Sequence, residues 1–390
     1  MRNAARSTMT CVVILGVLYL GGATAMAQAP PAEIESMHPI DNGVFQVARI
    51  APSKQGGPQR WGVRAHFFVK NTGGATIELR KISLGYPGSP QAGGIVQLLN
   101  DTDDDPNVDS RDVLPGESNV FTIDDGVSNR NLVFPVPNQI RIRLSFDGFA
   151  DPLDFQAPMG VYTNRVLGGS YLFPAKRSDL RFGQHWSVGI HAFHRAQKFG
   201  YDFGVSRYDR SQKKWVGLKR GTTGSKNTDF LIYGKPVYAM AAGTIVKCAW
   251  SRPDNVPKQK LPGANHFVID HGNGEFALYA HLQEGSVNPR LCPKTVAENT
   301  YGLSIPVAAG QFLGRAGNSG RSSGPHLHVH VELGANGRPF TGSASTGRPL
   351  LFRDSHNRGG ASSSSLNARP FGFNALIGQM PVDRFNLIRP

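Results

Sequence analysis

The sequence predicts a mainly β protein, with an N-terminal β-sandwich of immunoglobulin-like kind followed by a second domain. The chain has 390 residues, and single cores stop growing at about 250 to 300 residues, so two domains are expected. Glycine (46) and proline (27) are abundant and charged residues make up only 18%. Turns are therefore frequent and long solvated helices few. Alternation of apolar and polar residues then locates the strands.

Residues 1–27 are predicted to be a secretory signal peptide. Arg2 and Arg6 supply the positive start, residues 11–20 are apolar, and residues 25–27 form a small-residue cleavage site. An uncleaved membrane anchor is the weaker alternative, because Gly21 and Gly22 shorten the apolar run below the roughly 20 residues that span a bilayer. We therefore expect a secreted or periplasmic protein, which contacts the membrane only through the signal peptide before cleavage.

Residues 28–150 are predicted to form the β-sandwich. The stretch Trp61–Val69 alternates apolar and mostly polar residues and ends at an Asn71–Gly74 turn, which is typical of a strand with one buried face. Ile140–Phe146 repeats the pattern, with Arg141 and Arg143 pointing outward. Several such strands at short spacing favour a small sandwich.

An acidic cluster in the same region offers oxygen ligands of the kind that calcium accepts. It lacks the glycine with which an EF-type loop turns sharply, so an acidic surface turn is the favoured interpretation. Its members are Asp101, Asp103, Asp104, Asp105 and Asp109.

The second half of the chain divides into three predicted segments. Residues 151–185 contain scattered glycine and proline and are expected to link the domains. Residues 186–333 form the second domain. Residues 334–390 begin as a Gly/Ser-rich linker and end in an apolar tail, of which a short segment is expected to dock on the body.

The net charge limits the kinds of molecule that the protein is expected to bind, and the cysteine content bears on whether it contains a disulfide. The formal net charge is +14, which draws an exported protein to anionic polymers or simply keeps it soluble. No nucleic-acid-binding pattern accompanies the charge, so nucleic acid is a poor partner. Cys248 and Cys292 remain after loss of the signal, and the sequence leaves open whether they form a disulfide or two separate buried thiols.

A run of alternating histidines, Pro325-His326-Leu327-His328-Val329-His330-Val331, points to the chemistry. In a strand, residues two apart share a face, so the three imidazoles face one side and the apolar residues face the core. Histidine is both a zinc ligand and a general base, so one strand can supply both roles. The alternative is a solvent-facing histidine stripe.

Three further residues, His194, Asp202 and His281, complete a candidate zinc site. A catalytic zinc commonly takes three protein ligands, and His194, Asp202 and His328 are of the residue types it needs. Residues 276–282 are predicted to be a buried strand that ends in His281. A neutral His281 beside the activated water would orient it or stabilise the oxyanion.

The order of these blocks resembles that of the lysostaphin/LytM-type zinc metallopeptidases, over roughly 140 residues. The blocks are His194 to Asp202, Pro236–Ala239 with Gly243–Val246, Val268–Gly274, Tyr279–Leu282, Gly310-Gln311, and Gly317–His328. The resemblance implies an antiparallel β-sheet metallopeptidase domain with a groove. It implies a zinc ion held by His194, Asp202 and His328, with His281 and His326 as non-ligating catalytic histidines. It also implies cleavage of peptide cross-links in peptidoglycan by zinc-promoted attack of water.

Two departures from the family pattern stand out. The interval from His194 to Asp202 is longer than the usual four residues, which makes His191 a competing first ligand. A glutamate often occupies the place of His330, which here is an extra imidazole with an expected structural role.

The basic insertion over residues 206–228 either borders the groove and contacts an anionic glycan or is a solvated loop, and the second is favoured.

The leading hypothesis is therefore an active peptidoglycan endopeptidase. A non-catalytic cell-wall-binding or regulatory protein of the same fold is a first alternative, but no ligand or catalytic histidine is missing. A metallopeptidase that acts on Gly-rich protein is a second. A regulatory protein partner is compatible with all three, and the N-terminal domain is expected to block the groove, bind the wall or act as a spacer.

Overall fold

The computed structural model describes residues 29–38, 40–41, 43–51, 58–87, 111–124, 135–190, 197, 199–339, 347–358, 374–376 and 386–390. This part of the chain is nearly all β and contains no α-helix, only the 3-10 turns η1 (Arg177–Asp179) and η2 (Asn227–Asp229). None of its helices is long and apolar enough to cross a membrane. The predicted β class is confirmed, whereas the signal peptide and the acidic cluster around Asp101 lie outside the described residues.

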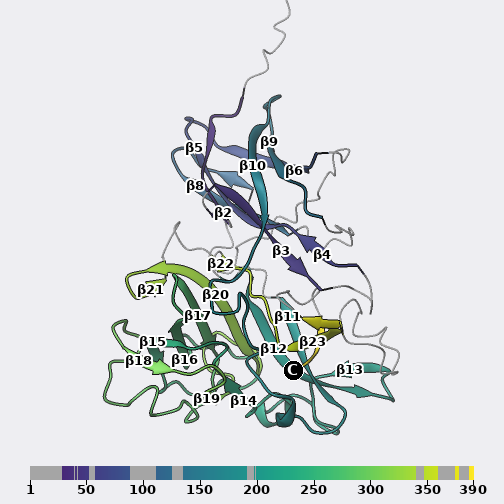
Figure 1. Cartoon of the computed structure of the whole chain (residues 1–390), viewed down its shortest axis with the longest axis vertical. Coiled ribbons are helices and arrows are strands. Elements are labelled where there is room, and N and C mark those ends of the chain that lie inside the picture. The colour runs from purple at the N-terminus through teal and green to yellow at the C-terminus, as the bar shows by residue number, and fades with distance from the viewer. Residues whose placement is uncertain are drawn as a thin grey trace, which may run out of the picture.

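Two sheets built from the first half of the chain share one core (Figure 1). A three-stranded sheet has the order β1-β5-β8, and a second sheet has the order β2-β3-β10-β9-β6-β7 with β4 paired to β3. The strands are β1 Ala32–His38, β2 Ile40–Asp41, β3 Val44–Ile50, β4 Arg60–Gly62, β5 Arg64–Asn71, β6 Ile77–Gly85, β7 Asp112–Val113, β8 Ser118–Asp124, β9 Gln139–Phe146 and β10 Leu153–Val161. The immunoglobulin-like character stays a prediction.

The alternating run that starts at Trp61 supplies strands to both sheets. Its apolar residues are buried as predicted, but the ladder breaks at Val63, so that β4 pairs with β3 in one sheet and β5 pairs with β1 and β8 in the other. In β9 the apolar residues Ile140, Ile142, Leu144 and Phe146 are fully buried. Every second residue faces the core because side chains alternate across a strand.

Part of the predicted linker over residues 151–185 belongs to the folded body. Strand β10 pairs in antiparallel fashion with β9 and in parallel fashion with β3. After it, Tyr162, Tyr171 and Phe173 are buried in the same apolar cluster as the second half of the chain. The connection is therefore packed along much of its length, because its aromatic residues find partners there.

The second half of the chain forms one large sheet with the order β18-β15-β16-β17-β20-β12-β11-β25-β23-β24, to which β13, β21 and β22 add at the sides. The small pair β14-β19 lies separately. The strands are β11 Gln184–Ile190, β12 Tyr201–Asp209, β13 Lys214–Val216, β14 Pro236–Tyr238, β15 Gly243–Ala249, β16 His266–Asp270, β17 Glu275–Ala280, β18 Ile305–Val307, β19 Phe312–Arg315 and β20 Leu327–Ala335.

The segment after residue 334 adds further strands to this sheet. They are β21 Arg338–Pro339, β22 Gly347–Arg348, β23 Ser355–Arg358, β24 Asn374–Leu376 and β25 Asn386–Arg389. Strand β25 pairs with β11, and Ile388 is fully buried. Leu350, Leu351 and Phe352 are buried as well. The expected docking of the tail is therefore observed, and the residues just after 346, which were expected to belong to a linker, are core.

A disulfide joins Cys248 at the end of β15 to Cys292, with their Cα atoms 6.0 Å apart. Both residues are buried in the main apolar cluster. The structure therefore decides between the two alternatives that the sequence left open, because the fold brings the two side chains within the reach of a bridge.

Candidate metal and catalytic site

The histidine face of β20 is buried rather than exposed to solvent. Leu327, Val329 and Val331 point into the main core, as predicted from the alternation. On the other face, His328 and His330 have exposed fractions of only 3% and 2%. The alternative of a solvent-facing histidine stripe is therefore excluded for these two residues.

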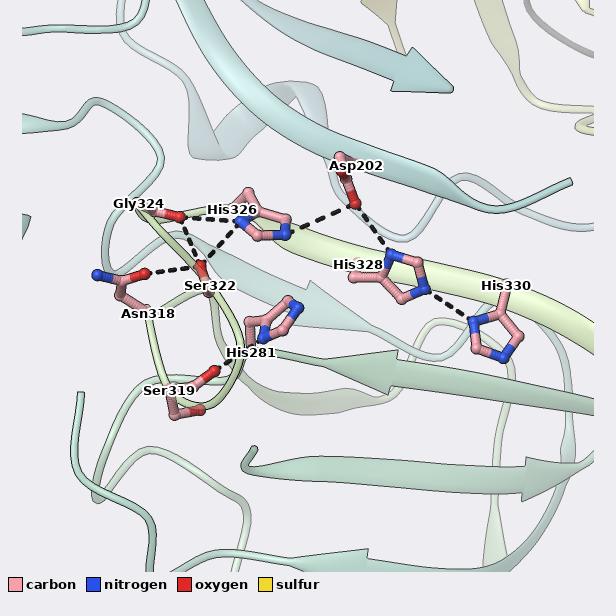
Figure 2. Close-up of polar contacts among 9 residues, drawn as sticks. All are labelled: Asp202, His281, Asn318, Ser319, Ser322, Gly324, His326, His328 and His330. Carbon is pink, nitrogen blue, oxygen red and sulfur yellow. Dashed lines mark hydrogen bonds and ion pairs between the residues drawn. The ribbon is translucent and has the colours of Figure 1, made fainter. Parts of the chain in front are cut away.

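Asp202 reaches the histidines because β12 is the direct neighbour of β20. The register pairs Asp202 with His328, and His328 is also opposite Ala280 of β17 on the other side. Asp202 Oδ1 lies 2.9 Å from His328 Nδ1 and 3.6 Å from His326 Nε2 (Figure 2). Asp202 thus lies in the same sheet as the histidines.

His281 enters the site through a turn at the end of β17. It has a φ of +63°, a left-handed conformation that is uncommon outside glycine. Its ring centroid lies 4.5 Å from that of His326 and 6.1 Å from that of His328. The structure therefore brings together Asp202, His281, His326 and His328, as the sequence predicted.

The loop Gly317–Gly324 holds both His281 and His326 in place. The Gly317 N–H donates to the carbonyl of His281 at 2.9 Å, and the N–H of His326 donates to the carbonyl of Gly317 at 3.2 Å. A Cβ atom at Gly317 would lie 2.2 Å from the Cα of Gln283, so only glycine allows this approach. The loop therefore positions the two histidines relative to each other.

Hydrogen bonds to main-chain carbonyls select one tautomer of each of these two histidines. His326 Nδ1 lies 2.8 Å from the carbonyl oxygen of Gly324, and His281 Nδ1 lies 2.7 Å from that of Ser319 (Figure 2). A carbonyl only accepts, so Nδ1 of each ring carries the hydrogen and Nε2 of the neutral ring carries a lone pair. Each Nε2 is therefore an acceptor, suited to taking a proton from water.

The environment keeps His281 neutral. Burial lowers the pKa of His281 well below its usual range, and the nearby His326 and His328 lower it further. In this tautomer a neutral His281 accepts a hydrogen bond from water but does not donate one to an oxyanion. Of the two roles predicted for it, orientation of water is therefore the one that fits the geometry.

Two of the three predicted zinc ligands lie side by side. Asp202 and His328 provide the carboxylate oxygen and imidazole nitrogen that zinc prefers. The predicted third ligand, His194, and its competitor His191 lie outside the described residues. Within the described ranges, no set of three His, Cys, Asp or Glu side chains is arranged to hold a metal ion. The donors present fit a zinc site that takes its third ligand from the segment before Gly200.

His330 and Glu332 extend the site along β20. His328 Nε2 lies 2.8 Å from His330 Nδ1, and His330 Nε2 lies 2.5 Å from Glu332 Oε1. His330 was expected to be a structural imidazole, and no role was expected for Glu332. The two-residue period that grouped the histidines also places Glu332 on their face, so the signal was present in the sequence.

Two other histidines have main-chain partners of their own. His266 Nδ1 bonds to the carbonyl of Ala264, and His271 Nδ1 bonds to that of Ala242. The first part of the basic insertion lines a hollow of about 550 Å³ at the far end of β12 from Asp202, and seven residues of strand separate the two ends by roughly 23 Å. The last part of the insertion returns to the site, because Asn227 Oδ1 accepts a hydrogen bond from Asn318 Nδ2 in the Gly317–Gly324 loop at 2.9 Å.

Residues 224–341 match the model of peptidase family M23. The chain thus contains a domain of this family, in agreement with the predicted resemblance to lysostaphin/LytM-type peptidases. The matched range includes His281, His326 and His328 but not His194 or Asp202. The assignment of Asp202 therefore rests on its position opposite His328.

Two curated relatives are similar over part of the same region. Peptidoglycan DD-endopeptidase ShyA of Vibrio cholerae serotype O1 is 33% identical over 113 residues, which cover 29% of this chain and 20% of the relative. DD-carboxypeptidase/endopeptidase Mpg of Neisseria meningitidis serogroup B is 33% identical over 102 residues, covering 26% of this chain and 20% of the relative. The similarity spans about a fifth of the length of each relative.

Among solved structures, a putative peptidase M23 from Pseudomonas aeruginosa has 14% identity, with 73% of this chain and 91% of that chain covered at a TM-score of 0.24. The catalytic domain of lysostaphin from Staphylococcus simulans has 19% identity, with 45% and 95% covered at a TM-score of 0.22. Both TM-scores are low.

Proposed function

We propose that this protein is a zinc-dependent endopeptidase that hydrolyses the peptide cross-links of bacterial peptidoglycan outside the cytoplasm. One observation carries the proposal. Asp202 and His328 form a pair of zinc-type donors, and beside them His281 and His326 each turn an unprotonated Nε2 outward from a bonded Nδ1. Metal-dependent hydrolysis of a carbonyl compound needs this combination of ligands and proton acceptors.

His194, Asp202 and His328 would hold the zinc. When bound, zinc polarises the scissile carbonyl as a Lewis acid and lowers the pKa of water to about 7. Histidine and aspartate are ordinary zinc ligands, and three protein ligands leave a position open for chemistry. In the sequence His194 precedes β12, the strand that contains Asp202.

Of the two remaining histidines, His326 transfers a proton and His281 orients the attacking water. His326 Nε2 accepts a proton as water attacks, and Asp202 Oδ1 at 3.6 Å stabilises the resulting imidazolium. The same imidazolium then returns the proton to the leaving amine. His281, held by the Ser319 carbonyl, orients the water through its Nε2. The Gly317–Gly324 loop keeps the two rings at their distance.

The names of the two relatives favour peptidoglycan as the substrate. Both are described as endopeptidases, and one of them as a peptidoglycan DD-endopeptidase. The predicted signal peptide would take the protein to that substrate. The positive net charge of +14 adds attraction to anionic wall polymers.

Digestion of purified peptidoglycan by the mature, zinc-loaded protein tests the proposal. We expect soluble fragments with newly exposed amines, whose analysis identifies the bond, and we expect a zinc chelator to abolish their release. The His328→Ala variant serves as the inactive control, and a Gly-rich protein is tested in parallel. A folded, zinc-loaded sample that releases nothing from peptidoglycan contradicts the proposal.

A further inference from the structure

A row of three side chains leads from Asp202 along β20. Residues 328, 330 and 332 share one face of the strand because side chains alternate. Each contacts the next: His328 Nε2 lies 2.8 Å from His330 Nδ1, and His330 Nε2 lies 2.5 Å from Glu332 Oε1. The side chains of His328 and His330 are only 4% and 3% exposed. Water is therefore not available to replace the contact between the two imidazoles.

We propose that His330 and Glu332 form a relay that holds His328 as its Nε2–H tautomer and so presents the Nδ1 lone pair of His328 to the metal. The inference rests on the proposed function, in which His328 is a zinc ligand. In it, His330 and Glu332 are positioning residues that act through His328 and touch neither the metal nor the substrate.

The position of each hydrogen follows from the partners. A carboxylate only accepts, so His330 Nε2 carries the hydrogen that bonds to Glu332. A neutral imidazole has one N–H, so His330 Nδ1 accepts, and His328 Nε2 donates to it. His328 Nδ1 is then left with a lone pair directed at Asp202 Oδ1, 2.9 Å away.

The lone pair of His328 and the carboxylate of Asp202 are both acceptors, and they face each other. Such a pair is stable when a cation lies between the two, as a shared zinc ion would. The opposite tautomer of His328 would donate its Nδ1–H to Asp202 and leave His328 Nε2 and His330 Nδ1 as two acceptors in contact. The relay disfavours that state because water or a cation can reach Asp202, whose side chain is 36% exposed, but not the contact between the two buried imidazoles.

A zinc-bound histidine is usually oriented by one group that accepts the hydrogen bond of its second N–H. In this protein two residues, His330 and Glu332, do this for His328. A zinc-bound histidine commonly donates its second N–H directly to a carboxylate, a carbonyl or water. Here the carboxylate is that of Glu332. It accepts a hydrogen bond from His330, which in turn accepts one from His328. A glutamate at position 330 would accept the hydrogen directly, which makes His330→Glu the variant that preserves the function by a shorter route.

Zinc affinity and tautomer state test the relay separately from activity. Zinc dissociation constants are measured by competition with a chromophoric chelator for the wild type, His330→Leu and His330→Glu, with His266→Leu as a control at a histidine on another strand. We expect His330→Leu to weaken zinc binding about 10-fold to 100-fold, and His330→Glu and His266→Leu to stay close to the wild type. Thermal unfolding of each metal-free variant shows whether it folds.

Histidine ¹⁵N NMR of the metal-free wild type at about pH 8, where imidazoles are neutral, reads the tautomer directly. The signal of His328, assigned with His328→Ala, should be that of an Nε2–H ring. A folded His330→Leu protein with wild-type zinc affinity, or an Nδ1–H signal for His328, overturns the relay. A wild type that shows the Nε2–H tautomer but binds no zinc contradicts the proposed function and leaves the tautomer assignment standing.

Discussion

The histidines around Asp202 differ in role because their ring nitrogens have different partners. His281 and His326 each donate a hydrogen bond from Nδ1–H to a main-chain carbonyl, which leaves Nε2 as an acceptor. His328 instead directs Nδ1 to Asp202 and Nε2 to His330. The same type of residue therefore fits the proposed role of proton acceptor in two cases and of metal ligand in the third.

Substitution of His281 and of His328 should separate these roles. His328→Ala is expected to lose zinc and activity together, because it removes a ligand. His281→Ala is expected to retain zinc and to lower kcat about 100-fold to 10,000-fold, the usual contribution of a positioned proton-transfer group. Metal content and turnover on peptidoglycan are measured for both variants. Full activity of a zinc-loaded His281→Ala protein would show that His281 has no catalytic role.

His271 should make the protein less stable in acid. Burial lowers its pKa to about 4 from the usual 6.5, so the unfolded state binds more protons between these values and stability is lost as the pH falls through this window. The free energy of unfolding should decrease by about 2 kcal/mol from pH 7 to pH 5 on account of this residue. Urea unfolding at both pH values should show a smaller decrease for His271→Gln than for the wild type.

The exposed His356 offers a matched control for this measurement. His356→Gln makes the same substitution at an exposed position and so controls for the change from histidine to glutamine itself. His266, whose pKa burial also lowers to about 4, accounts for part of the dependence that remains in His271→Gln. An unchanged slope in His271→Gln would mean that the neutral form of His271 is not favoured by folding.

At the scale of elements, the central strands β17, β20 and β12 put the site together. Tyr279 and Tyr201 lie on either side of Val329 in register, and one position away Ala280 and Asp202 lie on either side of His328. A shift of one residue would turn the histidines into the core and the apolar residues outward. Burial of Leu327, Val329 and Val331 therefore fixes the direction of the imidazoles.

The disulfide between Cys248 and Cys292 should stabilise this sheet. It closes a loop with a sequence separation of 44, for which restriction of the unfolded chain is worth about 4 kcal/mol. The double variant Cys248→Ala/Cys292→Ala should unfold at a lower urea concentration by a comparable free energy, and reductant should have no further effect on it. Equal midpoints for the variant and the oxidised wild type would contradict this prediction.

At the scale of the whole molecule, one buried carboxyl joins distant parts of the chain. Glu275 in β17 is fully buried. Its carboxyl oxygens accept hydrogen bonds from Tyr162 Oη at 2.6 Å, Tyr171 Oη at 2.8 Å and Asn164 Nδ2 at 3.3 Å. Asn164 also donates to the carbonyl of Pro349 at 2.8 Å. The connection between the two halves is therefore part of the structure that supports β17.

Truncation should locate the start of the independently stable unit. A chain that begins at residue 186, the predicted boundary of the second domain, lacks all three partners of Glu275. It should be less stable than a chain that begins at residue 161 by at least roughly 3 kcal/mol, because buried polar groups lose their partners. Thermal and urea unfolding of the two chains give the comparison. Equal stability would show that the connection is dispensable.

The sequence by itself determined the β class, the buried faces of the strands around Trp61 and Ile140, and the grouping of His281, His326 and His328 with Asp202. Alternation of side chains and a recognisable order of motifs are local properties, and these carried the prediction. Where the structure differs, as in the packed segment after Pro152, the deciding contacts join residues more than a hundred positions apart.

The tertiary structure alone decided the pairing of Cys248 with Cys292, the buried partners of Glu275 and the contact of His330 with Glu332. Each depends on which strands become neighbours, and strand order follows from the packing of the whole sheet. The tautomers of His281 and His326 were decided in the same way, because the carbonyls that select them reach the rings only through the fold of the Gly317–Gly324 loop. The local sequence therefore identifies the functional side chains, whereas contacts between distant segments decide which nitrogen of each imidazole carries the hydrogen.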